Sequence, residues 1–470
     1  MGGARERGAS RLLVAIVIAM VSVSGTGAAV LATRAGSGGT KHPVAHPAGA
    51  APEPSTAASP PSSPGPAPTL AAPSPPAFAS RLDAALGPAA GCVLIDDGTA
   101  GVYRRNATQP FAPASTQKLL VATAALAILG PDYRFTTAVV SSAPPRDGSV
   151  GGLWLVGGGD ALLASPEFAA HVAQDARADG LPLTPLGSLA DSLASAGVRL
   201  VAGPVHGDAS RYRDVAFLPT WSPTYRVEQD VGVLSALTLN EGLQQWKPSS
   251  KLAPDPPAFA ASELGRLLVA HGVPVGGPFD DQAAPAGAVV LAQVSSAPLG
   301  QIVSAMLRAS DNLIAELLVR ELDRQAGGAG TTAGGVQVVM RKDAQLGLPL
   351  AGVRLVDGSG LAGGDRATCA ALLAAMDLGA RAGFEAITAG LAVAGVSGTM
   401  VHRFAGTLLA GHLAAKTGWI DNVAGMAGRL QLPGRPALRF ALLVNQPMRY
   451  SDALAIENRF LDALATYPGG

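Results

Sequence analysis

The sequence carries little charge and no excess of either sign. Of 470 residues, 34 are Lys or Arg and 34 are Asp or Glu, so the formal net charge is zero and charged residues make up 14%. A protein that binds nucleic acid usually carries a basic patch or a basic domain. The composition gives no support to a nucleic-acid partner, and none is expected.

Cysteine is also scarce, since the chain has only Cys92 and Cys369. Two cysteines are too few for a cysteine-based metal cluster. We expect each of them to be a small buried apolar residue, which is a common environment for free cysteine. The alternative is a disulfide between them, which an exported protein would allow.

Several common catalytic motifs are missing. The seven histidines have no G-x-S-x-G serine to serve, so a Ser-His-Asp hydrolase is not indicated. No H-E-x-x-H or comparable cluster offers metal ligands, and the glycines at 157–159 lack the G-K-[ST] ending of a phosphate-binding loop. We therefore expect neither a metal nor another cofactor.

The N-terminal region has the form of an export sequence. Arg5, Arg7 and Arg11 precede an uncharged segment over residues 12–33, which matches a basic region followed by an apolar one. The segment has 33 − 12 + 1 = 22 residues, which is long for a cleaved signal peptide and about enough to span a bilayer. A cleaved signal peptide and a membrane anchor are both compatible with it, and either places the following chain outside the cytoplasm.

Residues 34–78 consist mostly of Ala, Pro, Ser, Gly and Thr. A segment with almost no large apolar side chain cannot bury enough surface to fold. Its prolines favour an extended spacer. We expect a disordered linker here, with the folded body starting at residue 79.

The folded body combines two kinds of pattern. Strands are expected near its start, over residues 91–95 and 101–103, and near its end, over 414–419, 424–432 and 437–445. Hairpins at opposite ends, with helices between them, predict one antiparallel sheet built from residues 79–140 and 295–470, an α/β (α+β) arrangement. Residues 141–294 alternate short strands with turns, which predicts an inserted, mainly-β domain of ordinary size.

The first candidate for chemistry is Ser115-x-x-Lys118. It follows Pro113 and precedes an apolar run that ends at Gly130-Pro131, which predicts a buried helix with the serine in its first turn. Residues three apart share a helix face. A serine needs a neighbouring base to become a nucleophile, and burial makes a lysine lose its proton more easily. The pattern is short, however, and also occurs on ordinary helices.

Two further motifs follow in order. Ser310-Asp311-Asn312 interrupts a helical region, and Lys416-Thr417-Gly418 lies on an expected strand. Class A β-lactamases and penicillin-binding proteins carry this set of three. The first two motifs are 310 − 115 = 195 residues apart, far more than in a class A β-lactamase. The chain resembles the peptidase S13 family over residues 80–465. These are D-alanyl-D-alanine carboxypeptidases of the DacB type, also called class C low-molecular-mass penicillin-binding proteins.

The resemblance implies a β-lactamase/transpeptidase-like fold and a reaction. The enzyme would remove the terminal D-alanine of peptidoglycan stem peptides through an acyl-enzyme on Ser115, and β-lactams would inhibit it covalently. Lys118 would take the serine proton, and Ser310 would relay a proton from Lys118 to the leaving nitrogen. The resemblance also implies that Asn312 binds the substrate backbone and that Lys416 and Thr417 bind its carboxylate. Gly418 would leave the strand edge open to the substrate. The N–H groups of Ser115 and Trp419 would form the oxyanion hole.

Trp419 departs from the family pattern, and Asp208 matches it. The residue after Gly418 is usually small and hydroxylated in this family, and here it is Trp419. Asp208 lies where relatives carry an acidic partner for the diaminopimelate side chain of the substrate, with an ordinary turn aspartate as the alternative.

Other activities on the same fold stay open from the sequence. They are cleavage of crosslinked stems as a DD-endopeptidase, β-lactamase or esterase activity, and non-catalytic binding to the cell wall. In each case the resemblance implies action outside the cytoplasm, with membrane contact through the N-terminal segment.

Overall fold

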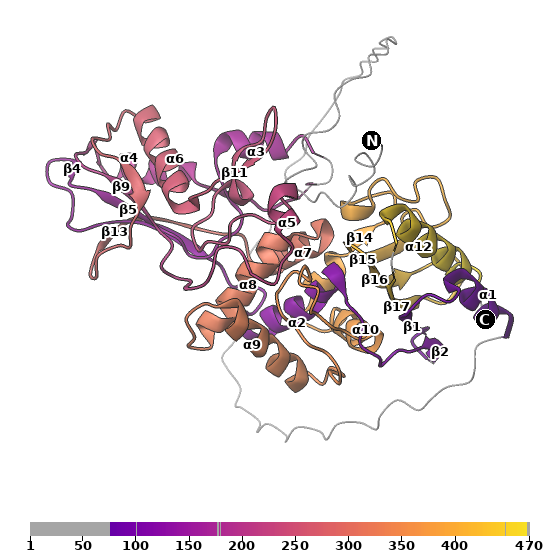
Figure 1. Ribbon diagram of the computed structural model, residues 1–470. Helices are drawn as coiled ribbons and strands as arrows, with labels where there is room; N and C mark the ends of the chain where they lie inside the picture. The colour runs from indigo at the N-terminus through magenta and orange to yellow at the C-terminus, as the bar shows by residue number, and fades with distance from the viewer. Residues whose placement is uncertain (1–75, 100, 176–177, 179, 447, 468–470) are drawn as a thin grey trace, which may run out of the picture. The chain divides into compact units, whose positions relative to one another are not determined.

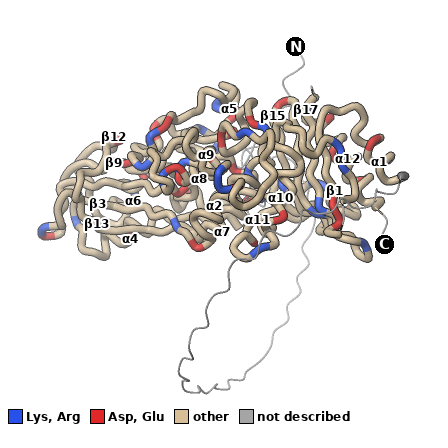
Figure 2. Tube along the Cα trace, turned by 90° about the horizontal axis from the view of Figure 1, so that it is seen from below, with Lys and Arg blue, Asp and Glu red and all other residues tan. Residues whose placement is uncertain are grey.

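A computed structural model describes residues 76–99, 101–175, 178, 180–446 and 448–467 (Figure 1). The expected signal or anchor over 1–33 and nearly all of the expected linker lie outside these residues. Helix α1 (Pro76–Leu86) opens the described part of the chain. Within the described ranges, no helix is both long and apolar enough to cross a membrane. Figure 2 shows basic and acidic residues interspersed along the trace.

A six-stranded antiparallel sheet forms the centre of the main body, as we call the folded chain before residue 136 and after residue 295. Its strands come from both ends of the folded chain, which confirms the predicted sheet. In spatial order they are β14 (Ala392–Val393), β15 (Leu413–Ile420), β16 (Val423–Leu430), β17 (Leu438–Asn445), β1 (Gly91–Asp96) and β2 (Gly101–Arg105).

The two faces of this sheet bury separate cores, because side chains along a strand alternate between faces. On β1, Val93 and Ile95 pack with α1 and with α12 (Tyr450–Leu464). Cys92 points to the opposite face, whose core continues into a group of packed helices (Figure 1). These helices are α2 (Lys118–Leu129), α7 (Leu299–Ala309), α8 (Asn312–Gln325), α9 (Thr332–Gln345), α10 (Cys369–Leu378) and α11 (Glu385–Ala389).

A second sheet lies in the segment between the first two motifs. Its order is β12 (Phe279–Asp281), β9 (Val205–Asp208), β5 (Leu153–Val156), β3 (Thr136–Ser141) and β13 (Val289–Ser295). Strands β3 and β13 pair with each other, so the chain enters and leaves this sheet at one place. We call residues 136–295 the insert. The sheet is mixed, since β5, β9 and β12 pair in parallel.

Helices α4 (Gly187–Ser195) and α6 (Pro256–Ala270) cover the insert sheet and close its core. Strand β9 is preceded in the chain by the short strand β8 (Leu200–Val201). Gly203-Pro204 separates the two, because proline has no N–H for a strand ladder. The remaining short elements are β4 (Ser149–Val150), β6 (Leu163–Ala164), α3 (Pro166–Val172), β7 (Thr184–Pro185), α5 (Pro223–Glu228), β10 (Leu243–Gln245) and β11 (Lys251–Leu252).

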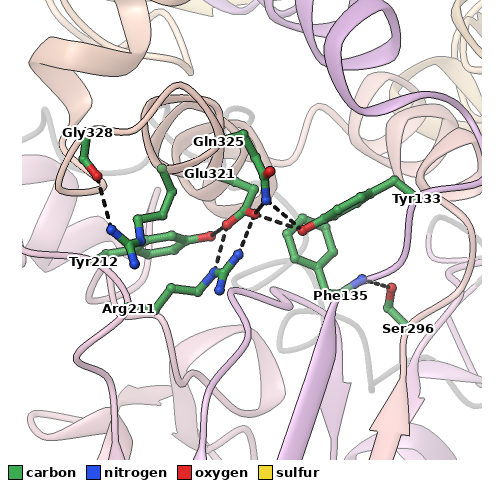
Figure 3. Close-up of polar contacts among 9 residues, drawn as sticks. Tyr133, Phe135, Arg211, Tyr212, Ser296, Glu321, Gln325 and Gly328 are labelled. Atoms are coloured by element: carbon green, nitrogen blue, oxygen red, sulfur yellow. Dashed lines mark hydrogen bonds and ion pairs between the residues drawn. The ribbon is translucent and has the colours of Figure 1, made fainter.

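A buried carboxylate joins the insert to the main body (Figure 3). Glu321 of α8 has no exposed surface and accepts hydrogen bonds from Arg211 and Tyr212 of the insert and from Tyr133, which follows α2. Gln325 adds a further bond from the same helix. Burial alone would raise the pKa of Glu321, but the bonds from Arg211 and Gln325 outweigh it and hold that pKa below its ordinary value.

Cys92 and Cys369 form a disulfide, so the expectation of two free cysteines is wrong. Both side chains are fully buried as expected, but they lie opposite each other. Cys92 is on β1, and Cys369 begins α10, which packs on that face of the sheet. The bond spans 277 residues of sequence, so it ties the first strand of the body to a late helix.

Removing this disulfide is expected to destabilise the fold. A crosslink across a long loop restricts the unfolded chain, and a typical contribution is about 2–4 kcal/mol. The double variant Cys92→Ala/Cys369→Ala should lose free energy of unfolding in that range in urea denaturation. A reducing agent should shift the wild type in the same way and leave the double variant unchanged. Equal stability of reduced and oxidised wild type would contradict the expectation.

Candidate active site

Ser115 lies in a 3-10 turn, Ala114–Gln117, directly before α2. The prediction placed it in the first turn of the α-helix, whereas the α-helix begins at Lys118, after the serine. Ala114 has a left-handed backbone with φ of 47°, which lets the chain turn sharply before the serine. Helix α2 is buried along most of its length, as its unbroken apolar sequence predicts. The serine is therefore held at the start of a rigid, buried element.

Lys118 makes three hydrogen bonds through its amine. Its Nζ lies 2.8 Å from Ser115 Oγ, 2.7 Å from Asn312 Oδ1 and 2.8 Å from the Ser359 carbonyl oxygen. The residue has no exposed surface. A neutral amine has two N–H groups and one lone pair, so it can donate to Asn312 and Ser359 while it accepts the proton of Ser115. The expected contact between Ser115 and Lys118 is present in the structure.

Burial lowers the pKa of Lys118 to about 8, although nearby carboxylates, Asp357 first among them, oppose the shift. At pH 7 a group with this pKa is unprotonated in about one molecule in ten. A lysine with an ordinary pKa would be unprotonated in only about one in three thousand. The environment of Lys118 therefore supplies a usable amount of free base near neutral pH.

The motif Ser310-Asp311-Asn312 connects two helices. Helix α7 ends at Ser310, which has a left-handed backbone with φ of 64°, and the Asp311 side chain caps α8 by accepting the N–H of Ile314. Asn312 is the first residue of α8 and reaches Lys118 through its Oδ1. The predicted break in this helical region is confirmed, and it brings Asn312 to the amine.

Ser310 has a different neighbour from the one expected. The sequence predicts Ser310 beside Lys118, but its Oγ accepts a hydrogen bond from Lys416 Nζ at 2.8 Å. The same amine donates to the Thr417 carbonyl oxygen at 2.5 Å, and Lys416 is fully buried. Burial lowers the pKa of Lys416 well below its ordinary value, and the nearby Lys118 lowers it further. The site thus contains two serine–lysine pairs.

Gly418 allows strand β15 to lie directly against the turn that carries the serine. A Cβ at this position would lie 2.9 Å from the backbone nitrogen of Thr116 and 3.0 Å from that of Ser115. Strand β14 pairs with β15 only up to Ala415. Beyond it, the described part of the chain provides no strand partner on that edge, so the edge from Lys416 onward is open to an extended peptide.

Trp419, which was expected at the site, and Thr399, which was not, both lie near this edge. Trp419 packs its ring edge-on against Tyr450, with centroids 5.2 Å apart, and its backbone lies on the open edge. Thr417 Oγ1 lies 2.8 Å from Thr399 Oγ1. Sequence reasoning missed Thr399, which lies in none of the three motifs. Its hydroxyl orients that of Thr417 and makes the edge more polar.

Asp208 is not brought into this cluster. It ends β9 in the insert sheet, where its Oδ1 accepts the N–H of Ser210 and its Oδ2 accepts the N–H of Ala284, both at 2.8 Å. The bond to Ser210 is that of a turn aspartate, the alternative considered for it, and the bond to Ala284 ties β9 to the segment after β12. The described residues also contain no group of three or more His, Cys, Asp or Glu side chains that could hold a metal ion.

A nucleophilic serine, a buried amine that can take its proton and an open strand edge suit acyl transfer from an extended peptide. Together with the antiparallel sheet and its covering helices, they define the penicillin-binding class of serine enzymes. The chain belongs to the D-Ala-D-Ala carboxypeptidase 3 (S13) family, whose sequence model matches residues 80–252 and 244–467.

Similar proteins cover most of the chain. A carboxypeptidase of Mycobacterium tuberculosis is 33% identical over 77% of this chain and 77% of its own length. A D-alanyl-D-alanine carboxypeptidase of an Actinomadura species is 28% identical over 82% and 83%, respectively. The crystal structure of penicillin-binding protein 4 (DacB) from Haemophilus influenzae has the same fold, with a TM-score of 0.69 at 19% identity. That comparison covers 83% of this chain and 99% of the other.

The rate of acylation should follow the ionisation of Lys118. Because the free amine is the active form, acylation is expected to rise about tenfold per pH unit below pH 8 and to level off above about pH 8. Single-turnover labelling with a fluorescent penicillin across this range measures the profile. A rate that is flat between about pH 6 and about pH 8 would contradict a base with this pKa.

Gly418→Ala should block the site without unfolding the protein. The added methyl group would press on the backbone nitrogens of Ser115 and Thr116, where the oxyanion is expected. Loss of one oxyanion donor costs about 10²–10³-fold in rate, so penicillin labelling should slow by at least about a hundredfold. Gly363→Ala is the matched control, because a Cβ there meets nothing within 4 Å. Similar labelling rates for both variants would count against the expected geometry.

Proposed function

We propose that this protein is a serine-type D-Ala-D-Ala carboxypeptidase that removes the terminal D-alanine of peptidoglycan stem peptides. The observation that carries the proposal is the contact of 2.8 Å between the Ser115 hydroxyl and the Lys118 amine, whose pKa is about 8. Membership of the S13 family supports the same activity. The proposal includes covalent inhibition by β-lactams, and a penicillin-binding protein of the same fold has been solved with a β-lactam.

In the acylation step, Ser115 Oγ attacks the penultimate carbonyl carbon while its proton passes to Lys118. The negative charge that develops on the carbonyl oxygen is held by the N–H groups of Ser115 and Trp419, an effect of about 3–4 kcal/mol per donor. The C–N bond then breaks and D-alanine leaves with a proton on its nitrogen. Water, activated by the same amine, releases the shortened peptide.

Proton delivery to the leaving nitrogen involves Ser310. Its hydroxyl oxygen accepts a hydrogen bond from Lys416 Nζ, so one of its lone pairs faces a second amine. In this arrangement Lys118 serves the nucleophile, while Ser310 and Lys416 serve the leaving group.

The substrate carboxylate supplies the counter-charge that Lys416 lacks in the free enzyme. Lys416 makes no ion pair within the part of the chain that the structure describes, and its amine bonds only Ser310 Oγ and the Thr417 carbonyl. A carboxylate bound at Thr417 and Thr399 would raise the pKa of Lys416 and favour its charged form. Recognition of a free carboxylate is what distinguishes a carboxypeptidase site from a general acyl-transfer site.

The basic and apolar N-terminal sequence supports action outside the cytoplasm. Arg5, Arg7 and Arg11 with the following uncharged segment form an export sequence, either cleaved or kept as an anchor, and the anchor would provide the membrane contact. Fractionation of cells that produce the full chain, with its N-terminus determined, distinguishes the two forms.

The test of the function combines labelling with product analysis. The purified chain should form a stable covalent adduct with a fluorescent penicillin and should release D-alanine from a peptide that ends in D-Ala-D-Ala. Ser115→Ala should lose both activities, because it removes the nucleophile. The same peptide with a C-terminal amide should be a poor substrate, since Lys416 then has no carboxylate to bind.

Other outcomes identify the alternatives. Rapid loss of the label would indicate a β-lactamase. Cleavage of crosslinked stem-peptide dimers into monomers would indicate a DD-endopeptidase. A folded wild type that neither takes the label nor releases D-alanine would point to a non-catalytic wall-binding protein and would overturn the proposal.

A further inference from the structure

The insert reaches the general base through a short segment, Trp221–Asp230. Two of the three groups that bind Lys118 Nζ are Asn312 and the Ser359 carbonyl. The Asn312 side chain uses its oxygen for Lys118 and its nitrogen for the Asp230 carbonyl oxygen, at 2.7 Å. One end of the segment therefore fixes the orientation of the amide that holds the amine.

The other end of the segment acts on the loop that carries Ser359. Asp357 in this loop is fully buried, and its carboxylate accepts the N–H groups of Gly360 and Ala362, both at 2.7 Å. These bonds shape the tight turn that points the Ser359 carbonyl at Lys118. The Gln117 side chain, one residue before Lys118, donates to the carbonyl and carboxylate oxygens of Asp357.

Trp221 completes the shell around this carboxylate. Its indole Nε1–H donates to Asp357 Oδ2 at 2.7 Å, and only 4% of the residue is exposed. Its ring also packs edge-on against Phe217, with centroids 4.9 Å apart. A hydrogen bond to a buried carboxylate is not weakened by competing water, so it orients the group strongly.

We propose that Trp221 is a positioning residue for the general base. Through Asp357 and the Ser359 carbonyl, Trp221 holds the Lys118 amine against Ser115. The inference rests on the proposed function, since it takes Lys118 as the base. It makes the insert part of the catalytic machinery. The helix between the two anchor points, α5, has no buried residue, so the segment is exposed between two buried contacts.

The electrostatic consequence gives the proposal a specific readout. Asp357 is the largest of the charges that oppose the effect of burial on the Lys118 pKa. Without the indole N–H, its negative charge is less neutralised, so the pKa of Lys118 should rise. The other charged groups that face Lys118 are Asp311, Glu316, Asp365 and Lys416, and the substitution leaves all of them in place.

The test compares two Trp→Phe variants in the insert. Trp221→Phe keeps the aromatic packing and removes the N–H. It should move the acid limb of penicillin acylation up by about half a pH unit and lower the plateau rate about tenfold. Trp154→Phe is the matched control, because the Trp154 Nε1 is buried without a hydrogen-bond partner. It should change neither quantity.

The pH midpoint separates positioning from stability. A purely structural role of Trp221 would lower the melting temperature or the fraction of protein that labels, but it would leave the midpoint where it is. A folded Trp221→Phe with the midpoint and plateau of the wild type overturns the proposal. A wild type without an acid limb near pH 8 would instead contradict Lys118 as the base, and with it the proposed function.

A second measurement needs no change at Trp221. The chain has four tryptophans, and their indole N–H signals can be followed by NMR on the ¹⁵N-labelled protein and assigned by Phe substitution at the other three. The Trp221 signal should shift with the same midpoint as acylation, and the shift should vanish in Lys118→Met. A signal that stays constant from about pH 6 to about pH 10 overturns the proposal.

Discussion

The site depends on the burial of two lysines in one small volume. Lys118 and Lys416 both have no exposed surface, and the nearby Lys118 lowers the pKa of Lys416 further than burial alone, because two ammonium groups would repel. Each amine instead lies among neutral partners: a serine hydroxyl together with carbonyl or amide oxygens. The free amine that activates Ser115 is a product of this environment rather than of lysine itself.

Burial on its own would lower the pKa of Lys118 too far. A lysine that never takes a proton is as useless to a base-catalysed step as one that never releases it. The carboxylates behind the Ser359 loop counteract the burial of Lys118 and leave its pKa near the physiological range. Asp357 is both the strongest of these charges and the residue that shapes the loop, so charge and geometry at the base are set by one side chain.

The sequence was sufficient for the features that depend on local pattern. The apolar run after Lys118, the helix break at Ser310 and the strand with Gly418 all have local signatures, and all three were predicted. The partners of Ser310, Glu321 and Cys92 were not, because each lies more than a hundred residues away in sequence. For Asp208 the glycine–aspartate context matched a family pattern, whereas the structure shows its two oxygens bonded to the N–H groups of Ser210 and Ala284, and the second of these lies far away in sequence.

The strand order of the central sheet has a consequence for how the chain is made. Strand β1 is among the first parts of the folded body to leave the ribosome, yet it lies between β2 and β17, and its Asp96 pairs with Arg439. A chain that crosses a membrane from its N-terminus presents β1 with a bare edge until almost the whole polypeptide has followed. The insert, by contrast, contains all strands of its own sheet, including the paired β3 and β13. It can therefore fold before β17, the partner of β1, has been made. Folding outside the cytoplasm would then proceed from the middle of the chain, with the catalytic site assembled last.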